Sequence, residues 1–148
     1  MRRPVPAGLA LVGLTALLSA CATRTVPRES DPGELAAVAP MLAVELFLQA
    51  ANGRDYDRMA GLFGTVEGPV QGDPQDVELR MATIAELLAH ERYELVSERL
   101  APGRADPTRR VSVNLTISGE LFSDVGFMVV RTPRGRWMVQ EIDLEKVA

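Results

Sequence analysis

Apolar residues between positions 34 and 90 recur at the three-to-four-residue spacing of amphipathic helices. Over residues 34–51 they gather on one face, and Pro40 predicts that the regular helix begins close to it, because proline is tolerated only in the first turn. Asn52 and Gly53 then favour a helix end, since both residue types adopt the left-handed backbone conformation. The predicted buried face of this helix holds Met41, Val44, Phe47, Leu48 and Ala51.

Two more helices are predicted to follow, each after an aspartate that suits a helix N-cap. Asp55 precedes a short stretch over residues 56–63 with an apolar face. Asp73 precedes Pro74, and a capping acid followed by proline is a typical helix start. This third helix is expected to run to about His90, with a buried stripe of Val77, Met81, Ile84, Leu87 and Leu88.

From residue 92 the apolar period changes to two, which is the period of a half-buried strand. The alternation predicts strands over residues 92–100, 111–118, 121–131 and 136–144. Short turns at residues 118–120 and 132–135 make neighbouring strands antiparallel. Helices followed by a meander of at least four strands predict an α+β fold, in which three N-terminal helices cover the apolar face of the sheet.

Residues 1–20 have the pattern of an export signal. Arg2 and Arg3 are basic, an apolar run over residues 9–18 follows, and Ser19 and Ala20 are small. The apolar run is shorter than the ~20 residues that a membrane-spanning helix needs. A cleaved signal peptide is therefore expected.

The residues around the expected cleavage site, Leu18-Ser19-Ala20-Cys21, resemble the lipobox of bacterial lipoproteins. The resemblance implies that Cys21 is lipidated and becomes the acylated N-terminus, held at the membrane by two or three acyl chains. Ala22 is not the aspartate that retains lipoproteins at the inner membrane, which favours the outer membrane where one is present. The domain would then face the periplasm or the exterior of the cell envelope.

Three segments result: the signal peptide (1–20), the lipidated cysteine with a flexible tether (21–33), and one globular domain (34–148). The whole chain carries a net charge of −4, and removal of Arg2 and Arg3 makes it more acidic. An acidic domain argues against nucleic acid as a partner. A single histidine and a single cysteine argue against a zinc or transition-metal site, and no cofactor is expected.

Two stretches resemble the nuclear-transport-factor-2-like superfamily, which includes SnoaL-like proteins and ketosteroid isomerases. They are residues 43–63, with the step Asn52-Gly53-Arg54-Asp55 between two helices, and the closing strand over residues 135–144. The resemblance implies a cone-shaped, cystatin-like architecture in which a curved sheet wraps round the helices and leaves an open cavity. Such cavities occur in enzymes, ligand-binding proteins and interaction domains alike, so the fold does not select a function.

The candidates for a catalytic base are His90 and Asp124. A histidine in the last turn of a helix also suits the helix dipole, and an acid on an edge strand also discourages aggregation. Candidates for ligand contacts at the cavity mouth are Tyr56, Arg80, Tyr93 and Asp124. Alternatives for two of them are solvent exposure of Tyr56 and pairing of Arg80 with Asp76 one turn earlier.

The sequence favours a non-catalytic envelope lipoprotein whose domain binds a small apolar ligand or an envelope protein. The grounds are the lipobox-like anchor at Cys21 and the lack of any group of residues in the pattern of a known catalytic site. One alternative is an enzyme of the SnoaL or ketosteroid-isomerase kind, with Asp124 or His90 as the base. Another is a structural or assembly module that forms a homodimer through the sheet.

Overall fold

A computed structural model of the chain describes residues 39–104 and 108–148. The predicted signal peptide, Cys21 and tether lie outside these residues. The described elements, in order, are α2 (Pro40–Asn52), α3 (Tyr56–Leu62), β1 (Gly64–Thr65), β2 (Gly68–Pro69), α4 (Pro74–Leu87), β3 (Arg92–Leu100), β4 (Thr108–Ile117), β5 (Glu120–Arg131), β6 (Trp137–Ile142) and the 3₁₀ turn η1 (Leu144–Lys146).

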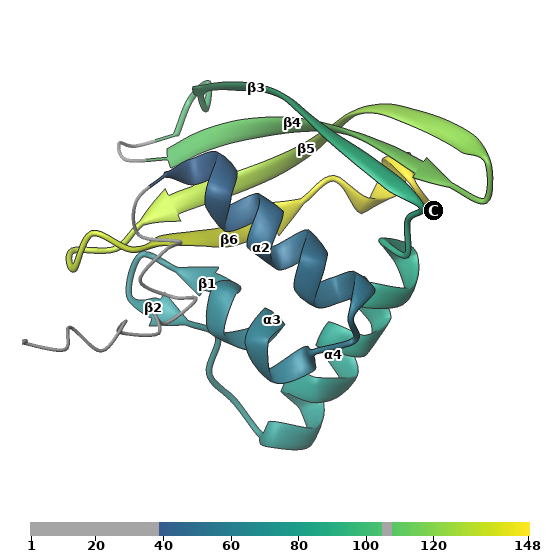
Figure 1. Cartoon of the computed structure of the whole chain (residues 1–148). Helices are drawn as coiled ribbons and strands as arrows, with labels where there is room; N and C mark the ends of the chain where they lie inside the picture. The colour runs from purple at the N-terminus through teal and green to yellow at the C-terminus, as the bar shows by residue number, and fades with distance from the viewer. Residues whose placement is uncertain (1–38, 105–107) are drawn as a thin grey trace, which may run out of the picture.

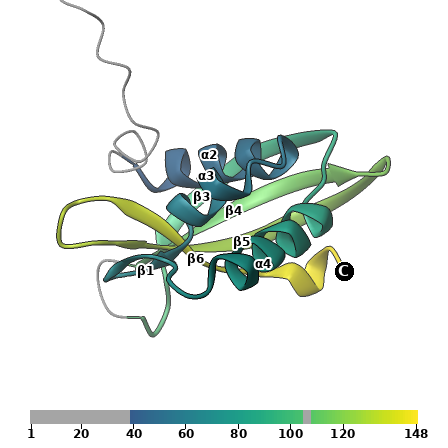
Figure 2. The same cartoon turned by 90° about the horizontal axis from the view of Figure 1, so that it is seen from below.

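The α+β class is confirmed. Strands β3, β4, β5 and β6 form an antiparallel sheet in that order, and the three α-helices lie on one of its faces (Figures 1 and 2). The described elements are not simply helices followed by strands. A small antiparallel sheet of β1 and β2 separates α3 from α4, and η1 follows the last strand.

Helix α2 packs between the sheet and the other two helices (Figure 1). It begins at Pro40, as predicted, because proline suits the first helical turn. Val44, Phe47, Leu48 and Ala51 of the predicted face are buried, and contacts on several sides of the helix also bury Ala43, Leu46 and Ala50. The helix therefore forms the centre of the core.

Both predicted caps are present. The side chain of Asp55 accepts a hydrogen bond from the backbone N–H of Arg58 (3.1 Å), and that of Asp73 accepts one from Gln75 (2.9 Å). Helix α4 ends at Leu87, however, so the prediction that it reaches His90 was wrong. The chain turns at the fully buried Leu88 in order to enter β3.

The predicted alternation of inward-facing and outward-facing side chains along β4 is confirmed. Val111, Val113 and Leu115 are fully buried beneath the helices, while Ser112 and Asn114 lie on the opposite face of the sheet, here called the outer face. The β4–β5 register shifts between Val113 and Leu115, which pair with Val125 and Phe122. This irregularity leaves Ser123 and Asp124 outside the regular pairing.

One continuous cluster of apolar side chains joins α2, α3 and α4 to all four strands of the large sheet. Its largest fully buried members include Phe47, Met59, Met81, Leu88, Leu115 and Phe127. This core fills the space between α2 and the central strands, and the hollows described below lie at its periphery. Since the cluster is supplied by the described segments themselves, a segment that contains residues 39–148 has its own core for folding.

Candidate functional site

A groove of about 510 Å³ lies between α4 and β6, and we call it the α4–β6 groove. Strand β6 is at the edge of the large sheet, and its free edge is bridged at Val139 by Phe63 in parallel register. The groove is lined by α4 residues (Asp76, Leu79, Arg80, Thr83 and Ile84), by β6 residues (Gln140, Glu141 and Ile142), and by Phe63 and Leu144.

The groove has an apolar floor and an exposed apolar residue at its mouth. Phe63 and Ile84 belong to the buried core, and Ile142 and Leu144 pack against it. Leu79, in contrast, is 68% exposed although it lies beside these residues. An apolar pocket of this size with a few polar groups is the usual form of a small-molecule site, for which ~300–1,000 Å³ is typical.

The main polar group of the groove is the guanidinium of Arg80. Its central carbon lies 4.9 Å from the centre of the Phe63 ring, in a cation–π contact. The predicted alternative, an ion pair between Arg80 and Asp76, is not formed. Another polar group is already engaged, because the hydroxyl of Thr83 donates a hydrogen bond to the Leu79 carbonyl oxygen (2.9 Å).

A second hollow, of about 400 Å³, adjoins the groove. The two share Phe63, Arg80 and Gln140, and the second is otherwise lined by residues of the β1–β2 hairpin and its flanks. Arg80 therefore lies at the junction of an apolar groove and a more polar hollow. Within the hairpin, Thr65 donates a hydrogen bond to Glu67, which holds the pKa of Glu67 below its usual range.

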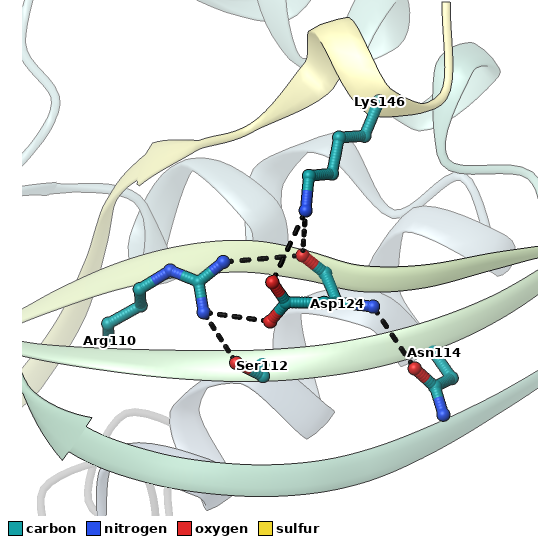
Figure 3. A network of polar contacts seen from close by, with 5 residues as sticks. All are labelled: Arg110, Ser112, Asn114, Asp124 and Lys146. Carbon is teal, nitrogen blue, oxygen red and sulfur yellow. Dashed lines mark hydrogen bonds and ion pairs between the residues drawn. The ribbon is translucent and has the colours of Figure 1, made fainter.

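Asp124 does not lie between the sheet and the helices, where a cavity base would be needed. Its backbone φ of 56° is in the left-handed region, at the β5 irregularity, and its carboxylate lies on the outer face (Figure 3). The extra residues of β5 shift the alternation of side chains, and sequence periodicity did not predict that shift. The edge-strand interpretation is also incomplete, because β5 is an inner strand, although β6 pairs with it only from Phe127 onward.

The Asp124 carboxylate closes a polar network between β4, β5 and η1 (Figure 3). Arg110 donates to Oδ1 (2.9 Å) and also to the Ser112 hydroxyl (2.6 Å). Lys146 donates to the Asp124 carbonyl oxygen (2.7 Å) and lies 3.3 Å from Oδ2. Hydrogen bonds, first with Arg110 and then with Ser112, hold the pKa of Asp124 well below its usual range.

His90 and Tyr93 lie together where α4 passes into β3, away from the α4–β6 groove. The Nδ1 atom of His90 lies 2.7 Å from the Leu88 carbonyl oxygen, and its ring meets the Tyr93 ring edge-on at 5.4 Å. The Tyr93 hydroxyl donates to Glu45 of α2 (2.9 Å). The side-chain amide of Asn52 bonds both the backbone N–H and the carbonyl oxygen of His90 (3.1 and 2.8 Å). These contacts join the end of α2 to the start of the sheet.

Tyr56 is half-buried and lines a separate hollow between α3 and α4, with Asp57 beside it. The structure therefore does not bring the four predicted ligand contacts together: Arg80 lies in the α4–β6 groove, while Tyr56, Tyr93 and Asp124 are elsewhere. Sequence reasoning missed the apolar lining. The available signal was Leu79, an apolar residue outside the predicted buried stripe of its helix.

Comparisons of the chain with protein-family models, with curated proteins and with solved structures find no match. Within residues 39–104 and 108–148, no group of three or more His, Cys, Asp or Glu side chains is arranged to hold a metal ion. None of the helices in this part of the chain has the length and apolar character needed to cross a membrane.

Proposed function

We propose that the chain is a membrane-anchored envelope lipoprotein whose domain is non-catalytic and binds a small apolar ligand in the α4–β6 groove. The observation that carries this proposal is the groove itself. It combines an apolar floor, an exposed leucine and a volume of about 510 Å³. Covering Leu79 with a ligand would remove apolar surface from water, which is the main driving force for binding of this kind.

The arrangement of the titratable side chains supports a binding role over catalysis. Asp124 is the acid with the most strongly shifted pKa, and its cationic partners lower that pKa, which makes it a weaker base. His90 is tied to a backbone carbonyl oxygen and does not line the groove. The groove therefore offers contact surface and polar anchoring, without a positioned acid–base pair among its lining residues.

The proposal includes membership of the nuclear-transport-factor-2-like superfamily and its cone-shaped, cystatin-like architecture. The order of elements supports it, since three helices precede a four-stranded antiparallel meander and pack on one of its faces. The centre of the domain is occupied by side chains such as Phe47 and Phe127. The proposed ligand is accordingly assigned to the side of the cone, between α4 and the edge strand.

The membrane attachment is proposed from the sequence of residues 1–33. Diacylglycerol on the Cys21 thiol and an acyl chain on its amine would hold the protein, and the tether would place the groove near the membrane surface. In bacteria with two membranes, the outer membrane is the proposed location. A ligand that partitions between membrane and water fits this placement.

The direct test uses the segment 22–148 and N-phenyl-1-naphthylamine, an uncharged apolar fluorophore. We expect saturable binding that Leu79→Asp weakens about tenfold or more, because the loss of a buried leucine contact is worth ~1.5–3 kcal/mol. Leu121→Asp is the matched control, since Leu121 is 62% exposed and lies outside the groove. Equal binding by both variants, or no saturable binding at all, would overturn the proposal.

A further inference from the structure

We infer that the ligand of the α4–β6 groove is a single-chain carboxylate amphiphile, with its head group on Arg80 and its chain against Leu79, Ile84 and Ile142. This inference rests on the proposed function and adds the chemical class of the ligand. It commits to a free acyl anion, not to a phospholipid in a bilayer. A groove of about 510 Å³ lies in the lower half of the range of small-molecule sites, which suits one chain better than two.

The first argument is the way in which Arg80 is held. Phe63 is only 6% exposed and belongs to the core, so its ring is a fixed support for the guanidinium 4.9 Å away. A cation–π contact uses the charge of the guanidinium and none of its N–H donors, and these donors can bind a carboxylate with two parallel hydrogen bonds. No carboxylate among the described residues forms an ion pair with Arg80, so these donors are available.

The second argument is the position of Arg80 along the groove. Arg80 lines the apolar groove together with Leu79 and Ile84, and it also lines the more polar hollow beside the β1–β2 hairpin. A ligand with one charged end and one apolar end matches this order of surfaces. The side-chain amide of Gln140 borders both hollows and can accept or donate a hydrogen bond beside the head group.

The third argument concerns the number of negative charges on the head group. Two acids also line the groove, Asp76 and Glu141. Glu141 is paired with Arg104 (2.6 Å), and Asp76 lies in the first turn of α4, where the helix dipole favours its charge. These charges repel a dianion more strongly than a monoanion. The surroundings of Arg80 therefore favour a carboxylate over a phosphate monoester.

The test compares laurate with dodecanol, which has a chain of the same length and no charge. Each competes with the fluorophore for the segment 22–148, at a pH well above the pKa of a carboxylic acid. We expect Arg80→Gln to weaken laurate about fivefold or more and to change dodecanol by less than about twofold. Arg134→Gln is the matched control, because Arg134 is exposed in the turn before β6 and lies outside both hollows.

The outcomes separate this inference from the proposed function. If Arg80→Gln changes laurate and dodecanol equally, or changes neither, the ligand class is wrong while the groove remains a binding site. If neither compound displaces the fluorophore from the wild-type segment, the ligand class is wrong as well, whereas the proposed function fails only if the fluorophore itself does not bind or is not weakened by Leu79→Asp. Arg80→Lys keeps the charge without the planar fork, and we expect it to restore only part of the laurate affinity. Thermal unfolding of each variant is measured alongside, and a cooperative transition is expected for all of them.

Discussion

The guanidinium of Arg110 lies over Gly126: a Cβ atom added to that glycine would be 2.9 Å from two of its nitrogens. The two residues come from neighbouring strands, and Gly126 pairs with Ser112 in the β4–β5 register. Because glycine has no side chain, the arginine can lie over β5 and reach Asp124. The polar network of the outer face thus depends on a residue that contributes no polar side chain to it.

The Asp124 network predicts a specific dependence of stability on pH. The folded-state pKa of Asp124 is lowered, so its contribution is complete above the unfolded pKa of about 3.9 and is lost as the pH falls towards the folded value. Asp124→Asn, which tolerates the same left-handed backbone, should be less stable by up to about 1 kcal/mol at neutral pH, because the side chain is 60% exposed and the pair is screened.

Urea unfolding across a pH series measures this effect. The stability difference between wild type and Asp124→Asn should shrink as the pH falls below about 4. Glu120→Gln, at the exposed start of β5, is the control and should show no such convergence. A difference that stays constant down to acid pH would contradict the assignment.

Gly61 and Gly64 are close in sequence, but replacing each with alanine should have opposite effects on stability. A Cβ on Gly64 would overlap the backbone carbonyl oxygen of Gly68, so Gly64→Ala should force β1 and β2 apart and cost about 1–3 kcal/mol. A Cβ on Gly61, within α3, would meet nothing within 4 Å. Gly61→Ala should therefore stabilise the domain by about 0.5–1 kcal/mol, since alanine is the better helix former.

Thermal or urea unfolding of the two alanine variants tests this prediction, because the free energy of unfolding should fall for Gly64→Ala and rise for Gly61→Ala. If both substitutions destabilise the domain to the same extent, the close approach at the β1–β2 hairpin does not account for Gly64.

The contact between Asn52 and His90 predicts that a side chain at the end of α2 contributes to stability through the start of β3. Asn52→Ala removes two hydrogen bonds to the His90 backbone and should lower the free energy of unfolding by about 1–2 kcal/mol. Gln49→Ala, one turn earlier on an exposed position of α2, should change it by less than about 0.5 kcal/mol. Equal effects at the two positions would show that the long-range contact contributes nothing.

The proposed anchor predicts that Cys21→Ser abolishes the incorporation of labelled palmitate in a bacterial host. The variant should also leave the membrane fraction, because two or three acyl chains are what make the attachment durable. A Cys21→Ser protein that still incorporates palmitate would contradict the lipobox assignment.

Local rules predicted the elements of this fold well. The range of β3 matches the prediction, α2 starts at its proline, and both capped helices start after their aspartates, because caps and periodicity depend on residues close in sequence. The end of α4 was missed by three residues. It depends on Leu88 and on the hydrogen bonds between Asn52 and His90, two residues 38 positions apart in the sequence.

The candidate site was predicted only in part, for the same physical reason. Arg80 was a candidate ligand contact and the structure places it in the groove, but its contact with Phe63 and its neighbours on β6 are tertiary contacts that periodicity does not predict. For Asp124 the sequence left two alternatives, a carboxylate in the cavity and an acid on an edge strand, and the β5 irregularity instead places it on the outer face of an inner strand. Periodicity in a single sequence does not reveal such an irregularity.

The most direct test of the ligand-binding groove is a titration of the isotope-labelled segment 22–148 with laurate, followed through its backbone amide resonances. Binding in the α4–β6 groove predicts that the largest changes occur at Leu79, Thr83, Gln140 and Ile142, on both sides of the groove. Tyr56, Tyr93 and Asp124, which lie elsewhere, should change little. Changes centred on those residues, or spread evenly over the domain, would contradict the account.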